Sequence, residues 1–189
     1  MTKQTKDVQT VIDELATKGV EALDAMANFT QEQVDHIVHQ AAIAALDKHM
    51  YLAKLAVDET GRGIYEDKAI KNMYASEYIW NSIKYDKTVG VIAEDKEQGL
   101  VSIAEPVGVI CGVTPTTNPT STTIFKALIA LKTRNSIIFG PHPRGINVCK
   151  VVVDLFRKEL AKLGLPEDLV LCLEEVSLED SNKLMSMVD

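Results

Sequence analysis

Hydrophobic residues recur at helical spacing through the first half of the chain. Between residues 7 and 26, 31 and 60, and 67 and 83, apolar side chains return every three or four positions, as on one buried face of an α-helix. Thr30 and Gln33 form a capping-box pattern before the second segment, because the hydroxyl and the amide satisfy free backbone N–H groups. We therefore expect mainly helices here, with the second one bent near His49 and ending before Gly61.

Residues 87 to 101 break this pattern. Their scattered valines, glycines and charges predict turns and short, exposed strands. We therefore divide the chain into an N-terminal helical region, residues 1–100, and a partial nucleotide-binding α/β region, residues 101–189.

The α/β pattern opens with the segment VGVICGV at residues 107–113. Its almost unbroken apolar character is typical of a strand buried on both faces of a parallel sheet. Asn118 and Pro119 then predict a helix start, since Asn is a good N-cap and proline lacks the N–H that would be unpaired there. The remaining elements are a helix over 119–132, a strand over 136–139, a rigid loop over 140–145, a helix over 147–163, a strand over 169–173 and a helix from residue 177. The order predicts the first part of a Rossmann-like, doubly wound sheet.

This sheet is expected to be incomplete. Because crossovers between parallel strands are right-handed, helices 119–132 and 147–163 fall on one face if the strands advance in one direction. The N-terminal helices are then the candidates to cover the opposite face. A small sheet buried on both faces also leaves apolar edges that are normally paired. We expect the chain to be the front part of a larger protein, or to have a partner that completes the sheet, and to associate when isolated.

Composition narrows the class of protein. The 189 residues are 46% hydrophobic, which is enough for a real core, and the net charge is −7 without a long run of one sign. This disfavours nucleic acid and anionic membranes as partners. The N-terminus has no signal-peptide core, and the three dispersed cysteines are typical of reduced, buried thiols. We expect a cytoplasmic protein.

Asn118 is the sharpest candidate for chemistry. The point where a strand ends and a capped helix begins is where α/β sheets place their ligands. A carboxamide there can donate a hydrogen bond to a developing oxyanion. The alternative is that Asn118 only caps its helix, and on physical grounds alone the cap is the favoured interpretation.

Two loops at the same end of the sheet are weaker candidates. Thr114-Pro115-Thr116-Thr117 is a polar turn that either lines a nucleotide or is an ordinary connection. The loop from Gly140 to Gly145, with His142 and Arg144 as its polar heads, is placed to meet a ribose or phosphate. It lacks the GxGxxG spacing of a dinucleotide-binding turn, so composition alone supports it weakly.

The remaining histidines and cysteines give no convincing site. His36 and His39 lie one helical turn apart, but no third metal ligand is evident, so a solvated helix face is favoured and no metal is expected. Cys111 lies within a strand, and Cys149 is followed by Lys150, which is weak ground for a reactive thiol. The chain therefore has a candidate oxyanion donor and no convincing nucleophile.

The segment EPVGVICGVTPTTNPTSTTIFKALIALKTRNSIIFGPHPRG, residues 105–145, resembles the aldehyde dehydrogenase superfamily, and within it the CoA-acylating branch. Among these it is most similar to the aldehyde dehydrogenase part of bifunctional aldehyde-alcohol dehydrogenases. The resemblance extends over DETGRGIYEDKAIKN upstream and LGLPEDLVLCLEE near the end. It implies an aldehyde-dehydrogenase-like fold and self-association into oligomers or filaments.

The resemblance also implies roles for residues. Asn118 matches the residue that donates its amide to the oxyanion of the thiohemiacetal. The turn at residues 114–117 matches the wall of the nicotinamide nucleotide, and Gly140-Pro141-His142 matches the loop beside the adenosine ribose. Ordinary members carry Lys and Glu where this chain has Gly140 and Pro143, which removes two ribose hydrogen bonds.

The implied reaction joins an aldehyde, coenzyme A and NAD to give acyl-CoA and NADH through a cysteine thioester. None of the three cysteines matches the family's nucleophile, so this polypeptide alone is expected to be inactive. The alternatives are a short, non-catalytic binding or assembly module of the same fold, and a microcompartment-type acylating aldehyde dehydrogenase.

Overall fold

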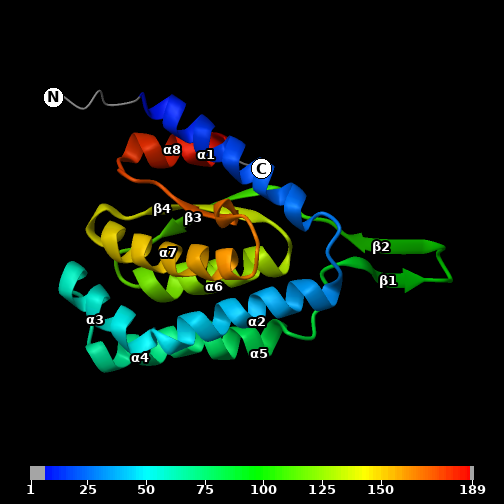
Figure 1. Ribbon diagram of the computed structural model, residues 1–189, viewed down its shortest axis with the longest axis horizontal. Helices are drawn as coiled ribbons and strands as arrows, with labels where there is room; N and C mark the ends of the chain where they lie inside the picture. Colours follow the sequence, from blue (N-terminus) through cyan, green and yellow to red (C-terminus); the bar gives the residue numbers. More distant parts are fainter. Residues whose placement is uncertain (1–6, 188–189) are drawn as a thin grey trace.

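The computed structural model describes residues 7–187, and its N-terminal half is helical as expected (Figure 1). The elements are α1 Val8–Leu23, η1 Asp24–Met26, α2 Gln31–Asp47, α3 His49–Thr60, α4 Tyr65–Met73, η2 Tyr74–Tyr78 and α5 Ile79–Ile83. The capping box is confirmed, since Thr30 Oγ1 accepts from the N–H of Gln33 and the Gln33 side chain accepts from the N–H of Thr30. The expected bend near His49 is instead a break at Lys48, and the third predicted helix contains one π-helical turn, η2.

The second half alternates strands and helices in the expected order. Its elements are β3 Val109–Thr114, α6 Pro119–Lys132, β4 Ser136–Pro141, η3 Pro143–Gly145, α7 Ile146–Lys162, η4 Glu167–Leu169, β5 Val170–Cys172 and α8 Leu178–Met187. Helix α6 has the predicted bounds, with Pro119 in its first turn. The predicted loop over 140–145 is wrong at its start, because Gly140 and Pro141 are buried in β4. Proline is tolerated at this strand end, where its missing N–H costs least.

The parallel sheet has the order β3-β4-β5, so its strands advance in one direction. Helices α6 and α7 cover one face, as the handedness rule predicts (Figure 1). On the other face α1 packs through Ile12 against Val109, Ile138 and Leu171. The expectation that the N-terminal helices alone cover this face is wrong in part. Helix α8 lies there too, through Leu184, while α2 packs on the outer side of α6 and α7.

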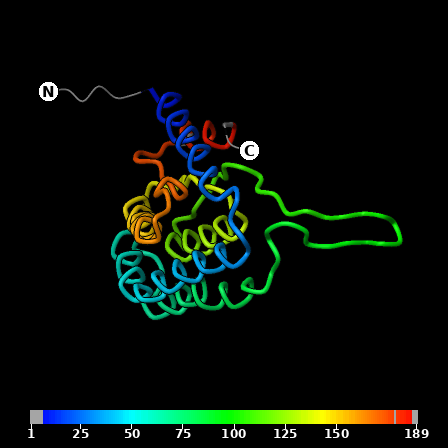
Figure 2. Tube along the Cα trace, turned by 45° about the vertical axis from the view of Figure 1, so that its right-hand side comes forward, coloured from blue at the N-terminus to red at the C-terminus, as the bar shows by residue number. Residues whose placement is uncertain are grey.

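A β-hairpin stands apart from this layered body (Figure 2). Its strands, β1 Gly90–Asp95 and β2 Leu100–Ala104, pair antiparallel with a register shift between Val91 and Ala93. Nearly every hairpin residue is exposed, which confirms the short, exposed strands predicted there. The division of the chain at residue 100 stays a prediction.

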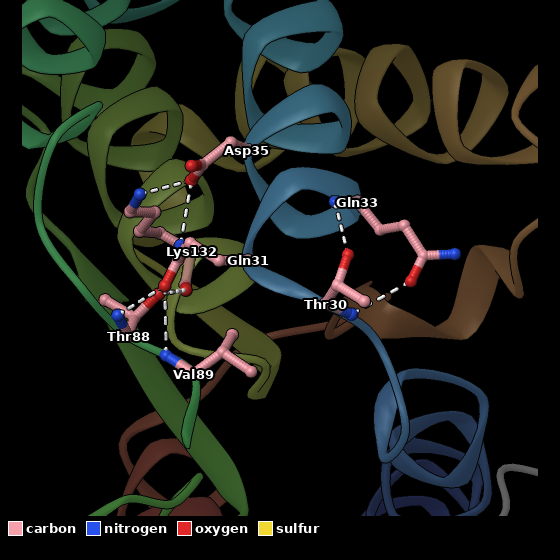
Figure 3. A network of polar contacts seen from close by, with 7 residues as sticks. All are labelled: Thr30, Gln31, Gln33, Asp35, Thr88, Val89 and Lys132. Atoms are coloured by element: carbon pink, nitrogen blue, oxygen red, sulfur yellow. Dashed lines mark hydrogen bonds and ion pairs between the residues drawn. The ribbon is translucent and has the colours of Figure 1, made fainter. Parts of the chain in front are cut away.

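A polar network joins the base of the hairpin to the body (Figure 3). The Gln31 Oε1 atom accepts from the N–H groups of Thr88 and Val89 at 2.7 and 3.1 Å. Thr88 Oγ1 donates to the carbonyl of Lys132 at 2.6 Å, and the Lys132 ammonium, which is buried, pairs with Asp35. The network fixes where the chain leaves the helical layers. Within residues 7–187, no helix has the length and apolar character needed to span a bilayer.

Candidate active site at the carboxyl ends of β3 and β4

The two candidate loops meet at one end of the sheet, as the sequence predicted. Thr114 and Pro141 are register partners at the ends of β3 and β4, and the N–H of His142 donates to the carbonyl of Thr114 at 3.0 Å. This places the segment after β3 beside the segment after β4. It is the position at which parallel α/β sheets bind ligands.

Asn118 occupies the N-cap position of α6, but its side chain does not cap the helix. The interpretation that physical grounds alone favoured is therefore wrong for the side chain. Its Oδ1 accepts instead from the Lys71 ammonium at 3.2 Å, and its Nδ2 makes only a long contact of 3.4 Å with Thr117 Oγ1. The amide N–H groups of Asn118 thus remain available to a ligand, because the carbonyl end holds the side chain in place.

Helix α4 supplies the partners that sequence reasoning missed. Lys68 is buried, and its ammonium donates to the carbonyl of Thr117 at 2.8 Å. Burial, and then the positive charge of Lys71, lower the pKa of Lys68. Asn72, also buried, accepts from Thr120 Oγ1 at 2.7 Å and so ties α4 to α6. The only sequence signal was a pair of lysines one helical turn apart, and nothing in it points to residue 118.

The hydroxyl groups of the turn differ in what they contact. Thr114 is buried, and its Oγ1 lies 3.9 Å from the Cys149 sulfur. Thr116 Oγ1 is buried without a hydrogen-bond partner. Pro115 and Thr117 are exposed. A polar atom buried without a partner is uncommon, and at the carboxyl end of a strand it suits a bound polar group.

The segment after β4 exposes less than expected. Gly140 and Pro141 are buried, so only their backbone can face a ligand, whereas His142 and Arg144 are exposed. His142 Nδ1 accepts from the N–H of Arg144 at 3.1 Å, which caps η3. The imidazole therefore has a local structural role in addition to any contact with a nucleotide.

The cysteines have the surroundings of packed thiols. Burial raises the pKa of Cys111, within β3, although the charge of Lys126 opposes this. The hydrogen bond between Cys149 and Cys172, followed by burial, raises the pKa of Cys172. Cys149 is fully buried and lies 3.3 Å from Thr123 Oγ1. An aldehyde therefore has no access to Cys149.

The remaining cavity, metal-ligand and histidine candidates lie away from this site. A cavity of about 630 Å³ lies between α1, α7 and β5, and two of its three lining cations, Lys150 and Arg157, are paired with Glu174 and Asp168. Among the described residues no cluster of His, Cys, Asp or Glu is arranged to hold a metal ion. His39 stacks on Trp80 with ring centroids 5.0 Å apart.

Residues 2–187 match the aldehyde dehydrogenase family. The chain belongs to this family. It is 54% identical over 163 residues to the bifunctional aldehyde-alcohol dehydrogenase AdhE of Escherichia coli (strain K12), a match that covers 86% of this chain and 18% of the relative. It is 47% identical over 187 residues to aldehyde-alcohol dehydrogenase 2 of Entamoeba histolytica, which covers 98% of this chain and 22% of the relative.

Solved structures of the family confirm the fold. An acetylating aldehyde dehydrogenase from Geobacillus thermoglucosidasius superposes with a TM-score of 0.91 at 38% identity, over 96% of this chain and 41% of that one. The predicted fold class, N-terminal helices followed by a Rossmann-like parallel sheet, is thereby confirmed, as is the resemblance to the acylating branch. The chain spans 18% to 22% of the length of these two curated relatives.

Proposed function

We propose that this chain supplies one side of the active site of a CoA-acylating acetaldehyde dehydrogenase, as part of a bifunctional aldehyde-alcohol dehydrogenase. The supporting observation is the Asn118 carboxamide, which lies at the carboxyl end of β3 with its oxygen held by Lys71 instead of capping the helix, so that its NH₂ group is left for a ligand. Relatives with aldehyde-alcohol dehydrogenase names reach 54% identity. The proposed reaction converts an aldehyde, coenzyme A and NAD to acyl-CoA, NADH and a proton.

The proposed role of Asn118 is to stabilise charge. Attack of a cysteine thiolate on the aldehyde carbon places a negative charge on the former carbonyl oxygen. A preorganised N–H donor near that oxygen lowers the barrier because it needs no reorientation as the charge develops. A propionaldehyde dehydrogenase of Rhodopseudomonas palustris has been solved with CoA and an acylated cysteine, which supports a thioester route in the branch.

A bound nicotinamide cofactor would supply the hydride acceptor of the proposed reaction. We propose that residues 114–117 line its nicotinamide nucleotide, with Thr116 Oγ1 as the unpartnered polar atom that fits such a group. We place Gly140, Pro141 and His142 beside the adenosine ribose. Of these, Gly140 and Pro141 act through the backbone because they are buried. An engineered glycolyl-CoA reductase solved with NADP⁺ is also similar to this chain, so the choice of NAD is part of the proposal.

The test is the substitution Asn118→Ala in the full-length protein that the gene encodes. Acetyl-CoA-dependent oxidation of NADH is expected to fall about 10²–10³-fold in kcat, the usual loss for one oxyanion donor. Asn81→Ala is the matched control, because Asn81 is exposed and its Oδ1 also accepts from a lysine, Lys84, at 3.0 Å. An unchanged kcat in Asn118→Ala would exclude the oxyanion role.

The alternative is a binding or assembly module without chemistry. It predicts that the expressed polypeptide binds a nicotinamide nucleotide but oxidises no NADH. The reading frame after Asp189 separates the cases directly, since the first proposal requires a cysteine-containing segment followed by an alcohol dehydrogenase region. Cytoplasmic location stays part of the proposal and is tested by cell fractionation.

We also propose that the hairpin mediates self-association. Its large apolar side chains are 42% to 58% exposed, and they lie on strands that the described chain leaves uncovered; they are Val91, Ile92, Leu100, Val101 and Ile103. Large exposed apolar surfaces mark interaction sites. The double substitution Val101→Lys, Ile103→Lys is expected to lower the oligomeric state in analytical ultracentrifugation, and a wild-type monomer at micromolar concentration would contradict the proposal.

A further inference from the structure

The proposed role of Asn118 requires that its carboxamide be held in one of two orientations. A carboxamide has an acceptor end and a donor end, and rotation by half a turn about the last side-chain bond exchanges them. Only the donor end stabilises an oxyanion, whereas the carbonyl end repels it. The capping bond that commonly fixes an Asn at this position is absent. Some other contact must therefore decide which end faces the reacting carbonyl.

Lys71 provides that contact. Its ammonium lies 3.2 Å from Asn118 Oδ1 and carries only donors, so the carbonyl end is held toward α4 and the NH₂ group points elsewhere. Among the residues that the structure describes, Nδ2 donates to Thr117 Oγ1 alone, and this 3.4 Å contact is longer than an ordinary N–H···O bond, so it cannot fix the rotamer by itself. A positive charge at the oxygen also polarises the amide and strengthens the hydrogen bonds that its N–H groups donate.

Helix α4 is anchored well enough to hold Lys71 in place. The Lys68 ammonium, three residues earlier, donates to the carbonyl of Thr117 and so fixes the backbone immediately before Asn118. The Asn72–Thr120 bond, between two buried side chains, joins α4 to the first turn of α6. Gly63 leaves space for the Lys68 stem, since a Cβ there would lie 3.1 Å from Lys68 Cε. Lys71 thus projects from a helix that is tied to the site at several points.

We propose that Lys71 is a positioning residue for oxyanion stabilisation: its ammonium holds Asn118 Oδ1 so that Asn118 Nδ2 faces the reacting carbonyl. This inference rests on the proposed acylating aldehyde dehydrogenase function. Lys71 acts through Asn118 and does not contact the substrate oxygen.

The first experiment is a double-mutant cycle in the polypeptide that the gene expresses. Lys71→Met keeps an unbranched side chain of nearly the same length and removes its charge, and it is expected to lower kcat about 10- to 100-fold, the effect of losing a hydrogen bond to a charged group. KM should change little, because the charge develops only after binding. In the Asn118→Ala background Lys71→Met should have no further effect, since residues that act through one another are not additive. An equal loss in both backgrounds would overturn the proposal.

Lys84→Met is the matched control. It breaks the corresponding Lys–Asn contact on α5, at Asn81, and should leave kcat unchanged. Lys71→Arg should retain most of the activity, because the guanidinium also donates to Oδ1. If Lys71→Arg is as slow as Lys71→Met while both remain folded, orientation by a positive charge is excluded.

A second measurement does not depend on turnover. The side-chain NH₂ resonances of Asn118, assigned by their absence in Asn118→Ala, should shift in the ¹⁵N–¹H spectrum of Lys71→Met and stay in place in Lys84→Met. Unchanged resonances in Lys71→Met would overturn the contact itself. If the resonances shift but Asn118→Ala leaves kcat unchanged, the contact stands and the proposed function fails, so the two outcomes are distinguishable.

Discussion

The hairpin and the parallel sheet share an apolar, β-branched character but have opposite surroundings. Both are rich in valine and isoleucine, yet all six residues of β4 are buried and nearly all those of β1 and β2 are exposed. The sheet lies between α6 and α7 on one side and α1 and α8 on the other, whereas the hairpin extends beyond these layers (Figure 2). An apolar strand is therefore stabilised by what covers it. The described residues leave the hairpin strands uncovered, which is the reason that we propose them as a surface for self-association.

The largest difference in the free energy of unfolding is expected when one apolar side chain is truncated in each region. Phe139→Ala in β4 removes a fully buried ring and should lower the free energy of unfolding by about 3–5 kcal/mol. Ile103→Ala in β2 removes a side chain that is 58% exposed and should change it by about 0.5 kcal/mol or less. Urea denaturation of dilute protein measures both values.

The same pair of variants tests whether the hairpin is covered in solution. At high protein concentration Ile103→Ala is expected to become more destabilising if the hairpin lies in an interface, because association stabilises only the folded form. A large loss that is independent of concentration would show that the hairpin packs on its own chain, and the contrast between the two regions would then be wrong.

A smaller loss of stability is expected from a substitution at the base of the hairpin, where it joins the layered body. Gln31→Leu removes the acceptor of the Thr88 and Val89 N–H groups and should cost about 1–3 kcal/mol, the penalty for unsatisfied donors (Figure 3). Hydrogen exchange should accelerate in β1 and β2 and remain slow in β4, since the sheet does not depend on this network.

Gln33→Leu is the matched control for this prediction. Gln33 lies two residues further along α2, and its side chain accepts from the N–H of Thr30 in the capping box. Its loss should cost about 1 kcal/mol and leave exchange in the hairpin unchanged. Equal acceleration in both variants would mean that the start of α2, rather than the Gln31 contacts, holds the hairpin.

Local signals in the sequence were sufficient for much of the fold. The Asn-Pro pair predicted the start of α6, and the Thr30–Gln33 spacing predicted the capping box, because both depend on neighbouring residues. The continuous apolar run at residues 107–113 predicted a strand of a parallel sheet for the same reason, and β3 covers most of it. The order of elements then fixed the face on which α6 and α7 lie.

Local signals of this kind could not predict contacts between residues that lie far apart in the sequence. The partner of Asn118 lies 47 positions away, so no spacing rule distinguishes a capping Asn from one held by Lys71. The end of β4 was missed because glycine and proline usually mark loops, while in this fold Pro141 pairs with Thr114. The location of α8 beside α1 also depends on tertiary packing, so it could not be predicted from the sequence of α8 alone.

The smallest expected effect is a pH dependence that only the buried sheet should show. Burial raises the pKa of Cys111 in β3 above its ordinary value of 9.0, so above about pH 9 the unfolded chain releases a proton that the folded chain retains. Stability from this group is complete below pH 9 and is lost as the pH rises toward the folded pKa.

Cys111→Ala should therefore show a shallower fall in the free energy of unfolding between about pH 8 and 10. Val113→Ala, a change in the same strand without an ionisable group, should shift the whole curve and keep its slope. A slope in Cys111→Ala that equals the wild-type slope would show that the thiol of β3 is as solvated as the residues of the hairpin.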